Sequence, residues 1–249
     1  MRKMHKLLKI SWLNVKNSVY SREFLLGIIA AFSYSLLWVF VVHPAQYRLE
    51  GYDFEFGRFL YVIILYAAVC IIRNDIRFNT SKTIFTGVFS RMEIMISKGI
   101  GLIIWGIIFS VIVEINNVLV SCILYKKIGI TGFLALNHLH LFITYIVITF
   151  CMGSLMVLIV SVMFSEKKSV IFIIGILSMV NFYTAAIPIL VGRHPEIAKN
   201  FSTYMKTPFY NTVLLMQGQF NIKSVLINIT WAMLFFILSV FIINKREIK

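Results

Sequence analysis

Six long apolar blocks constrain this chain more than any single residue does. They cover residues 24–42, 59–72, 99–124, 141–164, 169–191 and 225–243. A soluble fold of this length has no core that would bury stretches this long, whereas a helix that crosses a bilayer needs about 20 apolar residues. The sequence therefore predicts a polytopic membrane protein with six spans. The second block is the shortest, and it reaches spanning length if Arg58 and Arg73 snorkel at its two ends.

The apolar blocks are continuous rather than alternating, which is typical of membrane helices and not of the strands of a membrane barrel. Hydrophobic residues make up 59% of the chain and charged residues 14%, which lies outside the range of ordinary soluble domains. Six crossings use most of the 249 residues, and no connecting segment is long enough to form a domain of its own. We therefore expect an all-α fold with one membrane domain over residues 1–249.

The distribution of lysine and arginine predicts which side of the membrane each link faces. Segments 1–23, 73–98, 165–168 and 244–249 hold sixteen of the 24 basic residues, and the links on the other side hold eight over slightly more residues. Because cytoplasmic links carry the excess of basic residues, we expect both termini in the cytoplasm. The same rule accounts for the net charge of +14, together with anionic lipid headgroups, so nucleic acid is not an expected partner.

Residues 1–23 are amphipathic at helical spacing, with basic side chains on one side and Leu7, Trp12 and Val15 among those on the other. We predict a helix in the cytoplasmic interface, held by apolar burial and by attraction to anionic lipid. A plain basic tail that enforces the topology is the alternative. In either case this segment anchors the protein.

The link at 73–98 is long for a connection between spans, and it carries Phe78, Phe85, Val88 and Phe89. Side chains this apolar do not suit a solvated loop, so they must pack against the bundle, the lipid surface or another protein. A surface for a partner protein is the more specific hypothesis.

The run at 86–99, TGVFSRMEIMISKG, resembles the stretch after the second span in permeases of type-2 ATP-binding-cassette exporters. In that family a Ser-Arg pair, a Glu and a Gly-Lys lead into the third span, and Ser90, Arg91, Glu93 and Lys98 stand at similar spacing. The chain also resembles the family in its six spans, its interfacial helix, the short turn between the fourth and fifth spans and the longer outer segment before the last.

The resemblance implies partners. The chain has no GxxxxGK[ST] phosphate-binding loop, so ATP and Mg²⁺ would be bound by a separate cytoplasmic ATPase subunit, and this chain would hold no cofactor. A second permease subunit, identical or related, is implied as well. The site that would couple the ATPase to the spans comprises Phe78, Phe85, Val88, Phe89, Ser90, Arg91 and Glu93. An interfacial helix without a partner is the alternative.

Polar residues in the third span recur on one helical face: Ser110, Glu114, Asn117 and Ser121. A carboxyl group inside a span costs about 2–3 kcal/mol or more, so Glu114 is expected to face the protein interior or water. One hypothesis is that Ser110, Glu114 and Asn117, with Ser178 and Asn181 of the fifth span, line a polar translocation path. The alternative is that Glu114 forms a structural hydrogen bond to Ser178 and Asn181.

The outer segment at 192–222 has apolar residues between and after two prolines, a pattern that fits short helices dipping back into the membrane. The resemblance implies an outer gate here, which we assign to Tyr204 and Phe209. A short surface helix on the tops of the spans is the alternative.

Enzyme chemistry is not expected. None of the five histidines lies inside a predicted span, so an intramembrane serine hydrolase would have no base. His138 and His140 have the wrong spacing for two ligands on one helix face, and no metal site is expected.

The many aromatic residues, 15% of the chain, suit an amphipathic or hydrophobic cargo, although phenylalanine facing lipid explains the number equally well. The family resemblance and the short loops favour peptide export from a bacterial cell membrane. The alternative function is a membrane protein that transports nothing and serves as an immunity or scaffold protein, binding a peptide toxin or a partner.

Overall fold

The computed structural model describes residues 2–44, 47–77, 90–163 and 167–245. Over these residues the chain is helical and contains no strand, and six helices are long and apolar enough to cross a membrane. The predicted all-α fold with six membrane-spanning helices is therefore confirmed, and the protein is a multi-pass membrane protein.

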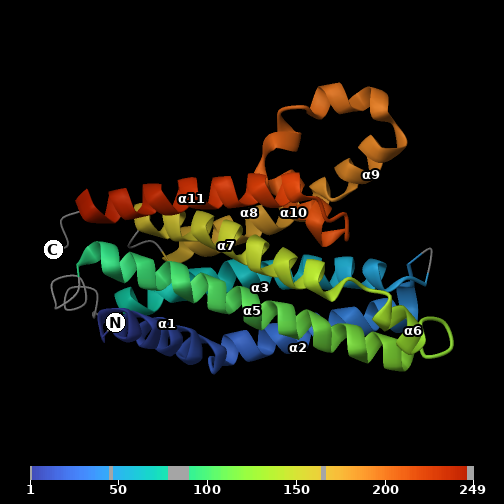
Figure 1. Cartoon of the computed structure of the whole chain (residues 1–249), viewed down its shortest axis with the longest axis horizontal. Coiled ribbons are helices and arrows are strands. Elements are labelled where there is room, and N and C mark those ends of the chain that lie inside the picture. Colours follow the sequence, from blue (N-terminus) through green and yellow to red (C-terminus); the bar gives the residue numbers. More distant parts are fainter. Residues whose placement is uncertain (1, 45–46, 78–89, 164–166, 246–249) are drawn as a thin grey trace.

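The long helices run roughly along one axis (Figure 1). After an initial helix α1 (Arg2–Val19), the six spans are α2 (Arg22–Leu37, continued by a π-helical turn at Trp38–Val42), α3 (Leu49–Arg77), α5 (Arg91–Ile123), α7 (His138–Val162), α8 (Lys167–Thr184) and α11 (Ile222–Lys245). The short α6 (Gly129–Leu134) joins α5 to α7. Between α8 and α11 lie α9 (Ala186–Arg193), the 3-10 turns η2 (Pro195–Phe201) and η3 (Tyr204–Lys206), and α10 (Pro208–Met216).

The start of α1 and the end of α11 lie at the same end of the bundle, which we call the terminal end (Figure 1). The opposite end, where α6 lies, is called the loop end. An even number of spans brings both ends of a chain to one side, as seen here. Which side faces the cytoplasm stays a prediction from the basic residues.

The centre of the bundle consists of α3, α5 and α7. In their apolar windows 72%, 56% and 67% of the residues are buried, against 17%, 22% and 22% in α2, α8 and the last span. Trp105 and Phe109 of α5 and Ile148 and Met152 of α7 are fully buried and belong to the main core cluster. The three peripheral helices leave most of their apolar side chains exposed, as helices in lipid do.

The contact between α5 and α7 depends on a glycine. A Cβ atom at Gly106 would lie 2.7 Å from the Cα atom of Ile146, which is closer than two carbon atoms approach without a shift of the backbone. The missing side chain lets the two helices meet at their backbones, as small residues do in membrane proteins.

Helix formation over the first residues is confirmed, since α1 packs along the half of α5 nearer the terminal end (Figure 1). Its buried face contains Leu7, Ser11 and Val15, and the Ser11 hydroxyl donates a hydrogen bond of 2.7 Å to the carbonyl of Ser97. Trp12 is half exposed on the other side. The position of α1 in the membrane interface stays a prediction.

Two span starts were wrong in the prediction. The third span starts at Arg91 rather than at residue 99. The second span starts at Leu49 rather than at residue 59, because acidic and basic side chains in its first turns lower the hydropathy although the helix buries them. The fifth block, 169–191, agrees with the apolar span at Val170–Arg193, but the helix is interrupted within it: α8 ends at Thr184 and α9 begins at Ala186. Pro188 explains this break, because a proline ring clashes with the carbonyl four residues earlier and donates no hydrogen bond to it.

Candidate functional site

A polar cavity of about 230 Å³ lies near the loop end, between α3, the start of α7 and the corner that connects α10 to α11. Its rim includes Glu50, Asn137 and Gly218, whose side chains or backbone are exposed, whereas Asp53 and Thr144 are buried. The cavity therefore runs from the surface at the loop end to a buried carboxylate. Its volume corresponds to about eight water molecules at roughly 30 Å³ each.

Asp53 is the most unusual group in this cavity. Its side chain is only 6% exposed, and its Oδ1 atom has no hydrogen-bond partner. No Lys, Arg or His of the described part of the chain forms an ion pair with it. Burial of a charged group is costly unless the charge is paired, so Asp53 is not explained by the stability of the fold.

The charges around Asp53 are also negative. Glu50 and Glu114 are the two carboxylates within electrostatic range of it, and the amide of Asn117 lies close to it. Asn117 is fully buried, and neither of its amide atoms has a partner by strict hydrogen-bond geometry. The sequence analysis placed Asn117 on a polar path. The structure brings it next to a carboxylate of α3 that the sequence analysis did not consider.

Close packing shapes the walls of the cavity. The Tyr145 hydroxyl of α7 lies directly over Gly57 of α3, where a Cβ atom would clash with it. The ring of His140 stacks on Phe220 with 3.9 Å between ring centroids and 5° between the ring planes. Gly218 turns the chain with a φ of +75°, a conformation that glycine adopts without strain. These contacts hold α3, α7 and the α10–α11 corner around one space.

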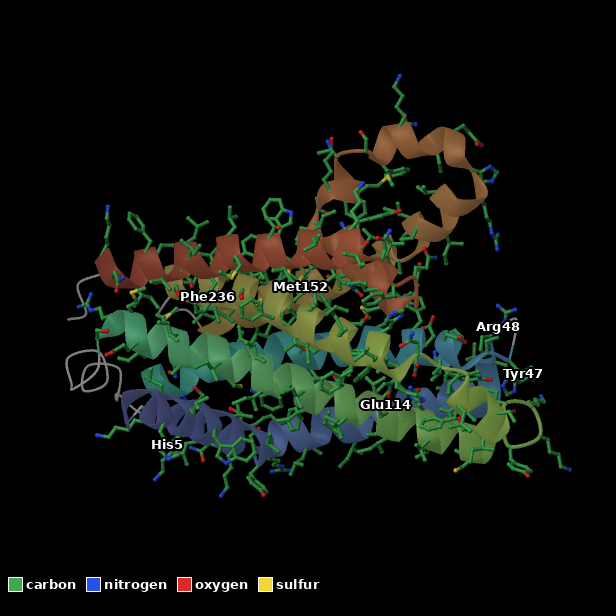
Figure 2. All side chains as sticks on the ribbon, in the orientation of Figure 1. His5, Tyr47, Arg48, Glu114, Met152 and Phe236 are labelled. Atoms are coloured by element: carbon green, nitrogen blue, oxygen red, sulfur yellow. The ribbon has the colours of Figure 1, made fainter. Side chains whose placement is uncertain are left out.

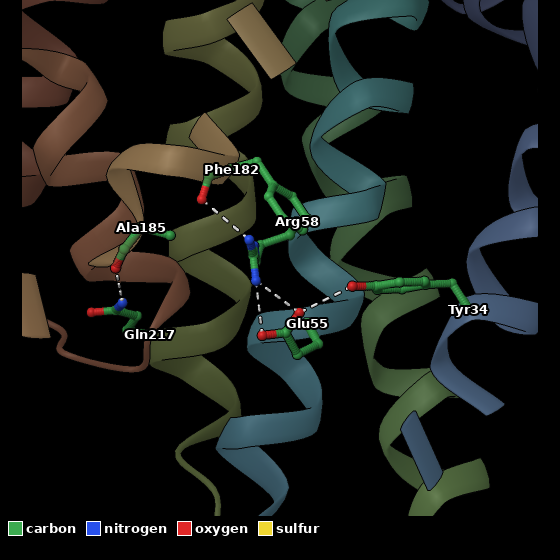
Figure 3. A network of polar contacts seen from close by, with 6 residues as sticks. All are labelled: Tyr34, Glu55, Arg58, Phe182, Ala185 and Gln217. Carbon is green, nitrogen blue, oxygen red and sulfur yellow. Dashed lines mark hydrogen bonds and ion pairs between the residues drawn. The ribbon is translucent and has the colours of Figure 1, made fainter. Parts of the chain in front are cut away.

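The break in the fifth span is tied to the same corner. Gln217 donates a hydrogen bond of 2.9 Å from Nε2 to the carbonyl of Ala185, at the break between α8 and α9 (Figure 3). Movement of α8 relative to the bundle would therefore displace the α10–α11 corner, which forms one wall of the cavity.

A second polar group lies deeper along α3 (Figure 3). Arg58 Nη1 donates to both carboxylate oxygens of Glu55 at 3.0 Å, and Tyr34 of α2 donates to the same carboxylate at 3.1 Å. Arg58 also donates from Nη2 to the carbonyl of Phe182 at 3.2 Å and lies 3.5 Å from the centroid of the Phe182 ring. Arg58 thus connects α3 to α8. It was predicted to snorkel toward the membrane surface, and that prediction is wrong because Glu55 supplies a partner inside the bundle.

Glu114 faces a different neighbour from the one considered in the sequence analysis. Its two carboxylate oxygens lie 2.9 and 3.1 Å from Nδ1 of His138, the first residue of α7. Glu114 lies toward the loop end, in the half of the bundle that contains Tyr47 and Arg48 (Figure 2). A shallow, mostly apolar groove beside Glu114 is bounded by Ser110 and Phe142. The expected structural bond to Ser178 and Asn181 is not formed.

The structure does not bring the other predicted path residues together. Ser110 is buried and donates to the carbonyls of Gly106 and Phe142, which fastens α5 to α7. Ser178 donates to Ile174 within its own helix, and Asn181 is buried in α8, which packs mainly on α3. The path role of these five residues stays a prediction.

Part of the predicted coupling site has a structural role at the terminal end. Ser90 and Glu93 form a capping box at the start of α5, and Arg91 Nη1 donates to the carbonyls of Ile243 and Asn244 at 3.1 Å. The ends of α5 and α11 at the terminal end of the bundle are thereby joined. The other members, Phe78, Phe85, Val88 and Phe89, lie outside the described residues.

The predicted outer gate residues lie at the base of an arm. In Figure 1, α9, η2 and η3 project from the bundle and α10 returns to it. Tyr204 and Tyr210 are neighbours, with 5.7 Å between ring centroids, and burial raises the pKa of the Tyr204 hydroxyl. Phe209 packs against the main core. Most residues of α10 are buried, while a re-entrant position in the membrane and the gate role both stay predictions.

Sequence reasoning missed Asp53, Glu55 and His138 as members of polar clusters. For Asp53 a signal was present: Glu50 and Asp53 stand three positions apart, which places them on one face of a helix. For His138 there was none, because its partner lies 24 residues away. The described residues contain no group of three or more His, Cys, Asp and Glu side chains placed to hold a metal ion.

Comparison with known proteins leaves these two clusters and the helical fold as the basis for any assignment. No protein-family model matches the chain, and no curated protein matches it significantly.

Proposed function

We propose that this protein is the membrane subunit of an ATP-driven exporter in a bacterial cell membrane, moving an amphipathic or hydrophobic cargo, with peptide as the expected class. In this proposal it works with a second permease subunit and with cytoplasmic ATPase subunits that bind ATP and Mg²⁺. Transport would alternate between states open to each side of the membrane.

The observation that carries the proposal is the construction of the chain between α8 and α11. The fifth span breaks at Ala185, an arm projects, and α10 returns to pack against α3, α7, α8 and α11. Interrupted helices beside a polar cavity are typical of transporters, in which backbone that is not helical is tolerated where protein or water covers it. A scaffold protein has no use for such a break.

The helix α1 and the terminal ends of α5 and α11 supply a second support. Arg91 links α5 to the last turn of α11, and Lys98 donates a hydrogen bond of 2.9 Å to the carbonyl of Ile71 near the end of α3. The segment that connects α3 to α5 therefore begins and ends on helices joined to the centre of the bundle. A force applied to that segment would reach the central helices directly.

Co-purification tests the proposal. The tagged full-length chain, extracted from the membranes of its native host in mild detergent, is expected to retain a vanadate-sensitive ATPase activity. The double variant Phe85→Asp/Phe89→Asp is expected to lose that activity, because two carboxylates in an apolar docking surface prevent its burial. The matched control is Tyr125→Asp, an exposed aromatic residue in the link after α5, which is expected to keep the activity.

Two results would contradict the proposal. One is wild-type protein that purifies, folded, without any ATPase activity. The other is equal loss of activity in the double variant and in the Tyr125→Asp control, because that loss would reflect general damage and not a dock on the cytoplasmic link.

A further inference from the structure

The cavity beside Asp53 holds acidic side chains and one imidazole, that of His140, whose ring is stacked on Phe220. Its only aspartate is buried with Oδ1 unpartnered, Glu50 stands on its rim, and no lysine or arginine lines it. Among the basic side chains at this end of α3, Arg48 is exposed and does not line the cavity, and two others have partners elsewhere. Arg58 is bound to Glu55, and Lys127 lies 3.7 Å from the centroid of the Tyr47 ring. The site is thus electrostatically incomplete.

The form of the cavity restricts the cation. A volume of about 230 Å³ is far larger than a single dehydrated metal ion needs, and the described residues around it offer no group of three metal-ligating side chains. The walls combine oxygen acceptors with apolar and aromatic surface, including Tyr145, Leu215 and Phe220. Such a mixture suits an ammonium group on an alkyl stem, since the carboxylate accepts its hydrogen bonds and the walls cover the methylene groups.

We propose that the cavity between α3, α7 and the α10–α11 corner binds a primary ammonium group, with Asp53 as its counter-ion and Glu50 as the group that attracts it at the rim. This proposal rests on the proposed function, since it names the part of the cargo that the exporter recognises. The ammonium group is that of a peptide, carried either on a lysine side chain or at the amino terminus.

The geometry also says how the ligand is held. The cavity opens at the loop end between Glu50 and Gly218 and extends to Asp53 next to Tyr145, so the ligand is held there with its ammonium group at Asp53. A Cβ atom at Gly218 would lie 3.6 Å from the Cγ atom of Glu50. The α10–α11 corner therefore borders the entrance of the cavity. Because Gln217 of this corner is bonded to the break at Ala185, a change in the fifth span would widen or narrow the entrance and so change the affinity.

A binding measurement without nucleotide tests the proposal. The full chain in nanodiscs of phosphatidylcholine is titrated into an amphipathic leucine-lysine peptide with a fluorophore at its carboxyl end, and anisotropy is read against empty nanodiscs. We expect Asp53→Asn to weaken binding about ten-fold or more and Glu50→Gln about three-fold, as expected for lost charge-assisted hydrogen bonds. The matched control Glu196→Gln removes an exposed carboxylate of the arm and is expected to leave the affinity unchanged.

Chemical variants of the peptide identify the source of the ammonium group. If acetylation of the lysine side chains weakens peptide binding to the wild type but changes binding to Asp53→Asn little, the lysine side chain is the ligand. If acetylation of the amino terminus has this effect instead, the amino terminus is the ligand. Equal affinity of wild type and Asp53→Asn overturns the proposal, as does wild-type binding that neither acetylation changes.

Folding and the exporter assignment are controlled separately. Asp53→Glu keeps the charge and is expected to retain binding within about three-fold, and if Asp53→Asn does not fold, Glu50→Gln and the acetylated peptides still decide the outcome. The assay contains no ATPase. The binding result therefore bears on the ammonium site alone. If binding depends on Asp53 but no ATPase co-purifies with the chain from its native membranes, the exporter is refuted and the site stands; if an ATPase co-purifies but binding does not depend on Asp53, only the site is refuted.

Discussion

At the scale of single residues, the charges buried near the loop end divide into two kinds. Glu55 and Arg58 satisfy one another, and Tyr34 and the carbonyl of Phe182 complete the set. Asp53, only two positions from Glu55 on the same helix, has no such partner. The first group is a structural cross-link between helices, and the second is available to a ligand.

The structural group predicts the cost of breaking it. Arg58→Met leaves Glu55 buried without its cation, and we expect the free energy of unfolding to fall by about 3–5 kcal/mol, measured by thermal unfolding in a mild detergent with circular dichroism at the helical band. The double variant Arg58→Met/Glu55→Gln is expected to recover part of the loss, because it removes the unpaired charge. Arg48→Met, at an exposed position, is the control, and a double variant less stable than the single one would contradict this account.

At the scale of helices, two kinds of contact fix the arrangement: backbone approach at the centre and polar links at the ends. Gly106 allows the approach of α5 to α7. Arg91 links the start of α5 to the end of α11. The two contacts are far apart along α5, so each can be tested alone.

Gly106→Ala is expected to destabilise the protein by about 1–3 kcal/mol, because the added methyl group forces α5 away from Ile146. The matched control is Gly175→Ala in α8, where a Cβ atom meets nothing within 4 Å and alanine favours the helix, so stability should stay equal or rise by up to about 1 kcal/mol. Thermal unfolding of the two variants side by side measures the difference. Equal melting temperatures would show that α5 and α7 do not meet at Gly106.

Arg91→Met removes the donor to the last carbonyls of α11. We expect faster amide hydrogen exchange in the last turns of that helix, residues 240–245, with little change in the centre of α5, read by mass spectrometry of peptide fragments. Arg193→Met, at the exposed end of α9, should leave that exchange unchanged. Exchange that rises uniformly over the whole protein would contradict a local link.

The sequence predicted these helices where apolar residues decide the structure and failed where polar residues do. The spans that became α2, α5, α7 and α11 follow from continuous apolar runs. The start of α3 did not, because Asp53 and Glu55 look like loop residues until the bundle that buries them is known. The start of α5 was readable, since Ser90 and Glu93 have the spacing of a capping box. The pairing of Glu114 with His138 was not readable, because it depends on how α5 and α7 are placed in space.

At the scale of the whole molecule, the two chain ends share one side and the acidic cavity opens at the other. If the basic residues place the terminal end in the cytoplasm, the cavity opens toward the outside. An exporter would then meet its cargo there at the end of transport, and the arm beside it would stand in the outer space.

The native cysteines test this orientation. Cys122, near the loop end of α5, is exposed, whereas Cys70 and Cys151 are buried. A maleimide that does not cross membranes is expected to label intact cells through Cys122, and Cys122→Ser should abolish the labelling, as followed by a gel shift. Labelling of Cys122 that appears only after the cells are permeabilised would place the loop end in the cytoplasm and reverse the topology.

The sparse burial of α2, α8 and α11 has a consequence for how this molecule must be handled. Each of these helices contacts the core through a narrow face and has most of its surface toward the lipid. The hydrocarbon chains are therefore as much a part of its environment as neighbouring residues are. Removal of the lipid by a harsh detergent would therefore loosen α2, α8 and α11 first. Loosening of α8 would also weaken the hydrogen bond between Gln217 and Ala185, while α3, α5 and α7 stay packed together. The thickness and fluidity of the host bilayer thus help to determine how these three helices pack on the rest of the protein.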